Sequence, residues 1–184
     1  NRPIQDGLFA HFKAIHDAVD IPIVIYNVPG RTVVDIAVET VGRLSKLANI
    51  VGIKDASGDL SRVHRHRELC GEEFMLLSGD DGTGADFCVL GGTGCISVTA
   101  NAAPQSNARL YATLRQGNVA AARALDEKLA LLHKTLFIEP SPAPAKYACS
   151  LLGHCAEDVR LPIIPCSPAA KEAVRAAMAR AELL

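Results

Sequence analysis

The sequence has no excess of charge of either sign and no long hydrophobic run. Its 19 lysine and arginine residues stand against 20 aspartate and glutamate residues, and a formal net charge of -1 does not favour a nucleic-acid or anionic membrane partner. The apolar runs, such as residues 21–26, are far shorter than the roughly 20 residues that cross a bilayer. Hydrophobic residues make up 49% of the 184 positions, which excludes a disordered chain. We therefore expect a soluble protein that acts on small molecules.

Patterns for disulfides and metal ions are also missing. The six cysteines contain no C-x-x-C spacing and mostly lie in apolar stretches, which favours buried free thiols in a cytoplasmic protein over disulfides. His64 and His66 are two residues apart and would point to different sides of a helix. The adjacent Asp80 and Asp81 could hold a divalent ion, but no histidine accompanies them. We expect no metal and no cofactor.

The glycine-rich stretches do not complete a dinucleotide-binding pattern. Residues 79–84 and 91–94 each begin a G-x-G-x-x-G motif, but Phe87 and Ser97 occupy the last position. The second stretch also precedes a predicted strand rather than a helix. An unrelated phosphate-binding protein is therefore a poorly supported alternative.

Four short runs are typical of strands, at residues 23–28, 50–54, 74–77 and 95–99. The first run is β-branched and continuous rather than alternating, and it ends in Pro29-Gly30, which predicts a strand buried on both faces. The runs begin about 21 to 27 residues apart, which is the length of a strand plus a crossover helix. Four such units indicate a parallel sheet with helices outside it.

Helical periodicity precedes the first run and fills the gaps between the others. One apolar stripe recurs at steps of 4, 3 and 4 in Leu8, Phe12, Ile15 and Val19. Asp35 and Asp59 are expected to cap the helices that follow the first and second runs.

The strand pattern stops at about Pro104, and alanine-rich helical sequence continues to the end of the chain. A second stripe with the same steps contains Leu125, Leu129, Leu132 and Leu136. Ser167-Pro168 predicts the start of the last helix. The sequence therefore predicts a βα part over residues 1–117 and an all-helical part over residues 118–184.

The candidate chemistry lies where the predicted strands end, because reacting groups collect at the carboxyl ends of parallel strands. Lys54 ends an apolar strand, and desolvation there would lower the pKa of its amine and make it a nucleophile toward a carbonyl. An ion pair with Asp55 or Asp80 is the alternative for this lysine. Tyr26 ends the preceding strand and could carry protons, unless it is a core tyrosine. Arg31 could bind a carboxylate, unless it is an ordinary exposed arginine.

Five segments of the sequence together resemble the dihydrodipicolinate synthase family. They are YNVPGRT at 26–32, GIKDASG at 52–58, LSGDD at 77–81, ISVTAN at 96–101 and FIEPSPAPAK at 137–146. The resemblance runs through essentially the whole chain, in order and with the expected gaps.

The resemblance implies an α/β fold, a (β/α)₈ barrel represented by its last four βα units and followed by an all-helical C-terminal domain. It implies a homo-oligomer, a dimer or tetramer, in the cytoplasm. The implied enzyme is a carbon–oxygen lyase with a class I Schiff-base mechanism. It would condense pyruvate with aspartate 4-semialdehyde to 4-hydroxy-tetrahydrodipicolinate in the diaminopimelate route to lysine.

The resemblance also implies a role for five residues. Lys54 matches the Schiff-base lysine, and Tyr26 matches the tyrosine that transfers protons. Arg31 matches the arginine that receives the carboxylate of the semialdehyde. Ile96 matches the residue whose backbone carbonyl faces the pyruvate, and Gly79 lies in the loop that lines this pocket.

The chain departs from the family in length. A (β/α)₈ barrel usually needs about 250 residues, and the first four strands, the Thr-Thr pair and the relay tyrosine expected just before Asn1 have no counterpart here. We therefore expect a fragment that could be inactive alone. Two alternatives stay open, another pyruvate-dependent aldolase of the N-acetylneuraminate lyase or sugar-acid type and a truncated non-catalytic binding or assembly module.

Overall fold

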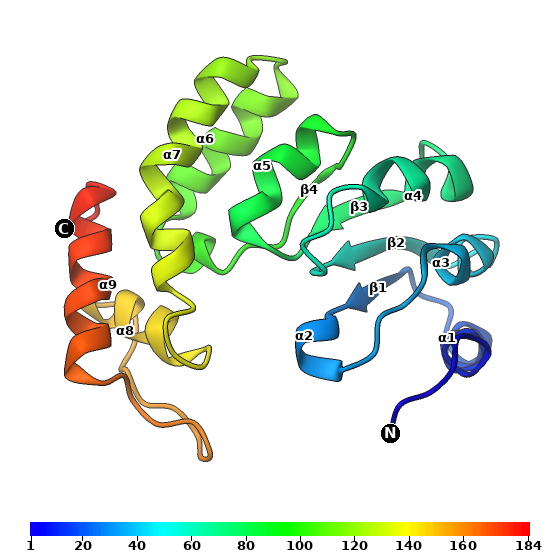
Figure 1. The fold of residues 1–184 in the computed structure, drawn as a ribbon, viewed down its shortest axis with the longest axis horizontal. Coiled ribbons are helices and arrows are strands. Elements are labelled where there is room, and N and C mark those ends of the chain that lie inside the picture. Colours follow the sequence, from blue (N-terminus) through cyan, green and yellow to red (C-terminus); the bar gives the residue numbers. More distant parts are fainter. The chain divides into compact units, whose positions relative to one another are not determined.

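The computed structural model describes residues 1–184, which form two compact units, residues 1–96 and residues 97–184. The first unit alternates helices with parallel strands (Figure 1). Its strands are β1 (Ile23–Asn27), β2 (Ile50–Asp55), β3 (Met75–Ser78) and β4 (Gly94–Cys95). Its helices are α1 (Gln5–Ala18), α2 (Pro29–Thr32), α3 (Val38–Leu44), α4 (Arg62–Cys70) and α5 (Asp81–Val89).

The four strands form one parallel sheet in the order β1-β2-β3-β4, which confirms the predicted α/β architecture. The register places Tyr26 beside Lys54, and Lys54 beside Leu77. The next row places Asn27 beside Asp55, and Asp55 beside Ser78. The carboxyl ends of neighbouring strands are therefore level with one another.

The fourth strand is shorter than the predicted run at residues 95–99, since it ends at Cys95. The sequence after it turns instead of extending: the Ser97 hydroxyl accepts a hydrogen bond from the Ala100 amide (2.9 Å), and Asn101 donates to the Val98 carbonyl (2.9 Å). Such local side-chain bonds compete with a strand ladder. Residues Thr99–Asn101 accordingly form a short 3₁₀ helix, η1.

The two faces of the sheet differ in burial. Ile25, Ile53 and Leu76 are fully buried against the helices of the first unit. On the opposite face Val24 is 37% exposed and Tyr26 45% exposed. The prediction that the first strand is buried on both faces is therefore wrong, because helices cover one face only and β1 pairs with a neighbour on one edge only.

Two of the three predicted helix caps are also wrong. The N-cap of α3 is Ala37, and the Asp35 carboxylate instead accepts hydrogen bonds from Asn27 and Arg62. Asp59 accepts from the amide and hydroxyl of Ser61 in the turn before α4, whose N-cap is Ser61 itself.

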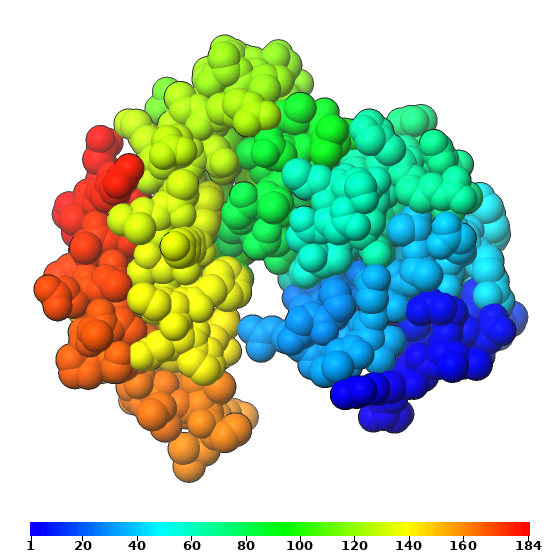
Figure 2. Space-filling view, in the orientation of Figure 1, coloured from blue at the N-terminus to red at the C-terminus, as the bar shows by residue number.

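The second unit is helical and consists of η1, α6 (Pro104–Arg115), α7 (Val119–Thr135), α8 (Ala143–Leu151) and α9 (Pro168–Arg180). The predicted cap of α9 is confirmed, since the Ser167 hydroxyl accepts from the Ala170 amide (3.2 Å). The predicted leucine stripe forms much of the core: Leu129, Leu132 and Leu136 are buried, whereas Leu125 is half-buried. Figure 2 shows α7, in yellow-green, packed against α9, in orange and red.

The division of the chain into units falls before α6, which packs against η1 and α7. The predicted boundary between residues 117 and 118 stays a prediction. None of the helices has both the length and the apolar composition that crossing a membrane requires. All six cysteines are free thiols, but only Cys166 is buried and Cys155 is exposed.

Candidate active site

Lys54 and Tyr26 form the centre of the candidate site. They lie side by side at the ends of β2 and β1, and Lys54 Nζ is 4.0 Å from the centroid of the Tyr26 ring. This geometry is a cation–π contact. Both side chains lie on the face of the sheet that the helices leave open, and Lys54 is half-buried.

The alternative role of Lys54, an ion pair with a neighbouring aspartate, is wrong. Asp55 binds Arg62 on the other face of the sheet, with 2.9 Å between Asp55 Oδ2 and Arg62 Nε. Asp80 accepts a hydrogen bond from the Thr83 hydroxyl (2.7 Å). Lys54 Nζ is therefore left without a carboxylate partner at the rim of the sheet.

Gly79 lies directly against the side chain of Lys54. A Cβ atom added to Gly79 would be 3.0 Å from Lys54 Cε and 2.8 Å from Ala56 Cβ, so residue 79 has no room for a side chain. The Gly79 amide also donates to the Asp55 carbonyl (2.7 Å), which continues the pairing of β2 with β3. The predicted pocket glycine is thus in contact with the predicted nucleophile.

Ile96 follows β4 and lies beside the end of β3. Its amide donates to the Ser78 carbonyl (2.9 Å), whereas its own carbonyl oxygen accepts no hydrogen bond. That free acceptor is the group for which the sequence resemblance predicts a role. The side chain of Ile96 is about half exposed.

Arg31 is not in contact with the other predicted site residues. It lies in the short helix α2, it is exposed, and its guanidinium forms no hydrogen bond or ion pair. The next residues make a tight turn in which the Thr32 hydroxyl bonds the Val28 and Val34 carbonyls, and Val33 has a φ of 58°. A left-handed backbone is rare for a β-branched residue and often marks a functional loop.

The sequence-based reasoning missed a buried polar network on the other face of the strand ends. Asn27 is 1% exposed and Asp55 is 5% exposed. Asn27 donates to the carboxylates of Asp35 (2.7 Å) and Asp55 (3.4 Å), and the Asp55 carboxylate also faces His66 Nε2 (3.4 Å) and Arg62. The alternation of side chains along a strand could have revealed this network. Asn27 and Asp55 directly follow Tyr26 and Lys54, so they must lie on the opposite face of the sheet.

The pKa of Asp55 reflects this network. Burial alone would raise it, but hydrogen bonds from His66 and Ser57 and the charge of Arg62 outweigh burial, and together they hold the pKa of the carboxyl well below its usual range. Asp55 is therefore an ionised structural carboxylate and not a proton donor.

Four of the six cysteines are poor candidates for an alternative nucleophile. Burial, with a smaller effect of Cys95, raises the pKa of the Cys88 thiol to about 12. Burial also raises the thiol pKa of Cys70, Cys149 and Cys166. A thiolate is the reactive form of cysteine, so these groups are poor nucleophiles.

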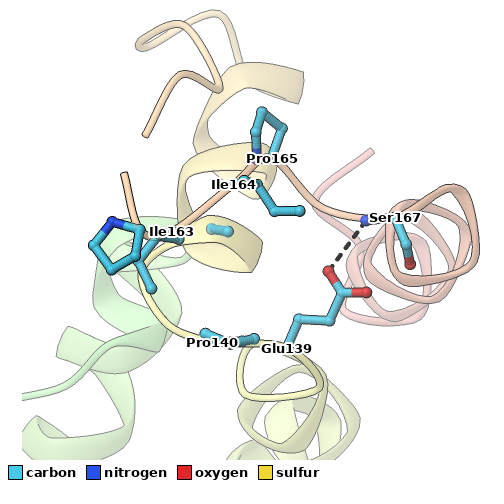
Figure 3. A pocket seen from close by; sticks show the side chains of 8 residues that line it. Glu139, Pro140, Ile163, Ile164, Pro165 and Ser167 are labelled. Atoms are coloured by element: carbon cyan, nitrogen blue, oxygen red, sulfur yellow. Dashed lines mark hydrogen bonds between the residues drawn. The ribbon is translucent and has the colours of Figure 1, made fainter. Parts of the chain in front are cut away.

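A separate pocket of about 380 Å³ lies in the second unit (Figure 3). Its lining is mostly apolar, with Pro140, Ile163, Ile164 and Pro165 around the Glu139 carboxylate. That carboxylate accepts a hydrogen bond from the Ser167 amide (3.1 Å), and this bond lowers the pKa of Glu139. The other polar side chain in its lining is that of Ser167, whose hydroxyl accepts the capping bond from the Ala170 amide.

The fold and the site define a class of protein, a parallel α/β protein with a lysine and a tyrosine paired at the carboxyl ends of neighbouring strands. The model of the Dihydrodipicolinate synthetase family matches residues 1–181. The chain belongs to this family.

Similar proteins agree in sequence and in structure. A 4-hydroxy-tetrahydrodipicolinate synthase of Rhodospirillum centenum is 55% identical over 184 residues, which are 100% of this chain and 63% of that protein. The solved dihydrodipicolinate synthase of Thermotoga maritima is 39% identical with a TM-score of 0.97, covering 100% of this chain and 64% of that one. A solved dihydrodipicolinate synthase of Acinetobacter baumannii, complexed with pyruvate, is 40% identical with a TM-score of 0.96, covering 100% of this chain and 63% of that one. The chain thus spans about 63% of the length of such relatives.

Proposed function

We propose that this chain carries the Schiff-base residues of a 4-hydroxy-tetrahydrodipicolinate synthase, a lyase that condenses pyruvate with aspartate 4-semialdehyde in the diaminopimelate route to lysine. The observation that carries the proposal is the Lys54–Tyr26 pair, with Nζ 4.0 Å from the ring centroid and no carboxylate on the amine. The family match and the pyruvate complex of the Acinetobacter baumannii relative support the same substrate.

In the proposed reaction the Lys54 amine attacks the ketone carbon of pyruvate. The former carbonyl oxygen leaves as water, and an imine between Lys54 and pyruvate remains. Tyr26 supplies and removes the protons of these steps as a general acid and base. Both residues lie on the open face of the sheet, where a substrate can reach them.

The other three residues would place the substrates. The absence of a side chain at Gly79 makes room for the side chain of Lys54, and the unbonded carbonyl of Ile96 would face the pyruvate. Arg31 would bind the carboxylate of the semialdehyde, for which a guanidinium without another partner is suited.

The proposal includes a specific architecture. The four strands would be the last four of a (β/α)₈ barrel, with residues 1–117 in the barrel and residues 118–184 in a helical C-terminal domain. The open edge of β1 supports this arrangement, and a cavity of about 470 Å³ lies at the carboxyl end of β1, between α1 and residues 28–36, and is lined in part by Tyr26. A further parallel strand pairing with β1 would cover this edge. We further propose a cytoplasmic homo-oligomer, a dimer or tetramer.

A condensation assay tests the function. We expect the purified protein to consume pyruvate and aspartate 4-semialdehyde together, and we expect Lys54→Ala to abolish this turnover while Lys13→Ala, at a half-exposed position in α1, preserves it. Equal turnover in Lys54→Ala and the parent would contradict the proposal. Absence of turnover in the folded parent would favour a non-catalytic binding or assembly module, and cleavage of N-acetylneuraminate or a sugar acid in its place would favour a sister aldolase.

A further inference from the structure

We infer that Arg62 is a positioning residue that fixes the segment carrying Arg31 to the strand end carrying Lys54, and thereby sets the binding of the second substrate. We name residues 28–36 the Arg31 loop. The inference rests on the proposed function for its substrate, and on the contacts of Arg62 for its physical basis.

The Arg62 guanidinium uses three nitrogens to join two segments. Nε donates to Asp55 at the end of β2 (2.9 Å), Nη1 donates to the Asp35 carboxylate (2.9 Å), and Nη2 donates to the Ile36 carbonyl (2.7 Å). The side chain of Arg62 is only 10% exposed. A planar guanidinium offers several donors at fixed angles, so this clamp also sets an orientation.

The Arg31 loop has few other hydrogen bonds to the strand ends. Asn27 bonds it from β1, where its amide donates to Asp35 (2.7 Å) and its oxygen accepts from the Ile36 amide (3.1 Å). Gln5 bonds the backbone of Asp35 and Ala37 from α1, away from the strand ends. Two side chains that bond the loop also bond Asp55 in β2. The bond from Arg62 is short (2.9 Å), whereas the bond from Asn27 is longer (3.4 Å).

The position of Arg31 depends on this clamp. Arg31 is four residues before Asp35, its guanidinium is free, and the left-handed Val33 between them must be held by its surroundings. Loosening residues 35 and 36 would therefore displace the guanidinium of Arg31, and even a small displacement of a group that positions a substrate lowers the efficiency of the enzyme.

Lys54 is held by other contacts. Its backbone pairs with Tyr26 on one side and Leu77 on the other, and its side chain packs on Gly79. A change at Arg62 should thus affect the two substrates differently. It should weaken the binding of aspartate 4-semialdehyde and change the adduct with pyruvate little. A purely stabilising residue would not make this distinction.

The test uses Arg62→Lys, with Asp35→Asn as a milder variant and Arg65→Lys as the matched control. Asp35 is about half exposed, so its substitution should not prevent folding, and Arg65 is a half-exposed arginine of the same helix. We expect Arg62→Lys to raise the KM for aspartate 4-semialdehyde about tenfold, the size of effect that lost hydrogen bonds to a charged group produce. The turnover number and borohydride trapping of pyruvate on Lys54 should stay close to the parent values.

Hydrogen exchange provides a readout without turnover. Amides of the Arg31 loop should exchange faster in Arg62→Lys and Asp35→Asn than in the parent or Arg65→Lys, while α4 stays protected. Suppose that the parent forms the Lys54 adduct. Unchanged exchange in the Arg31 loop of the variants, or an unchanged KM in Arg62→Lys, would then overturn the inference about Arg62 and leave the proposed function standing. Absence of the adduct in the parent would instead contradict the proposed function, and with it the substrate role of Arg62.

Discussion

The two faces of the sheet at its carboxyl ends have opposite properties, although they are built from adjacent residues. Tyr26 and Lys54 lie on the open face and have no ionic partner, whereas Asn27 and Asp55 lie on the helix-covered face and are almost fully buried and hydrogen-bonded. Because side chains alternate along a strand, one step in the sequence separates the proposed reactive group from a structural one. The comparison shows how a buried, hydrogen-bonded network on one face can support side chains on the other face that are left unpaired.

Truncating neighbouring residues on the two faces of β2 should have unequal effects on stability. Ile53 is fully buried in the core between the sheet and the helices, so we expect Ile53→Ala to lower the free energy of unfolding by about 2–5 kcal/mol. Lys54→Ala, on the open face, should change it by only about 0.5 kcal/mol. Urea unfolding of both variants measures the difference, and similar losses would show that the faces are not distinct in this way.

The second prediction concerns the hydroxyl of Tyr26. Tyr26→Phe keeps the ring beside Lys54 Nζ but removes the proton carrier, so turnover should fall about 10²-fold, the usual contribution of general acid–base catalysis. The free energy of unfolding should change little, because Tyr26 lies on the open face. Steady-state kinetics with Tyr111→Phe as the control would reveal the difference, and turnover at the parental rate in Tyr26→Phe would refute the role.

The smallest effect is a pH dependence on the helix-covered face. The pKa of Asp55 in the folded chain is below its ordinary value of 3.8, so the unfolded chain binds this proton first as the pH falls. The stabilisation by ionised Asp55 is thus present above the ordinary pKa and is lost progressively as the pH drops below about 4 towards the folded value. The urea concentration at the midpoint of unfolding should therefore fall less steeply with decreasing pH in Asp55→Asn than in the parent. Asp17→Asn, on the exposed side of α1, should leave this slope unchanged. A slope that is unchanged by Asp55→Asn would contradict this account of the network.

The sequence predicted one face of the site better than the other. The parallel strands, the lysine that ends the second run and the tyrosine that ends the first run followed from hydrophobic runs and from their spacing. The fully buried first strand was predicted wrongly, since a continuous apolar run does not show which neighbours cover each face. The Arg62 clamp was missed because it joins residues 27 and 26 positions away, Asp35 and Ile36, and such contacts exist only in the folded chain. The prediction that Asp35 caps a helix rested on the local sequence pattern. In the folded chain its carboxylate binds Asn27 and Arg62 instead.

The central claim is that the unpaired amine of Lys54 is the nucleophile of the open face. Incubating the protein with pyruvate and borohydride, then digesting it and weighing the peptides, tests this claim directly. The account predicts a reduced pyruvate adduct on the peptide that contains Lys54, and none on the other lysine peptides. An adduct at another lysine, or no adduct on the folded protein, would contradict it.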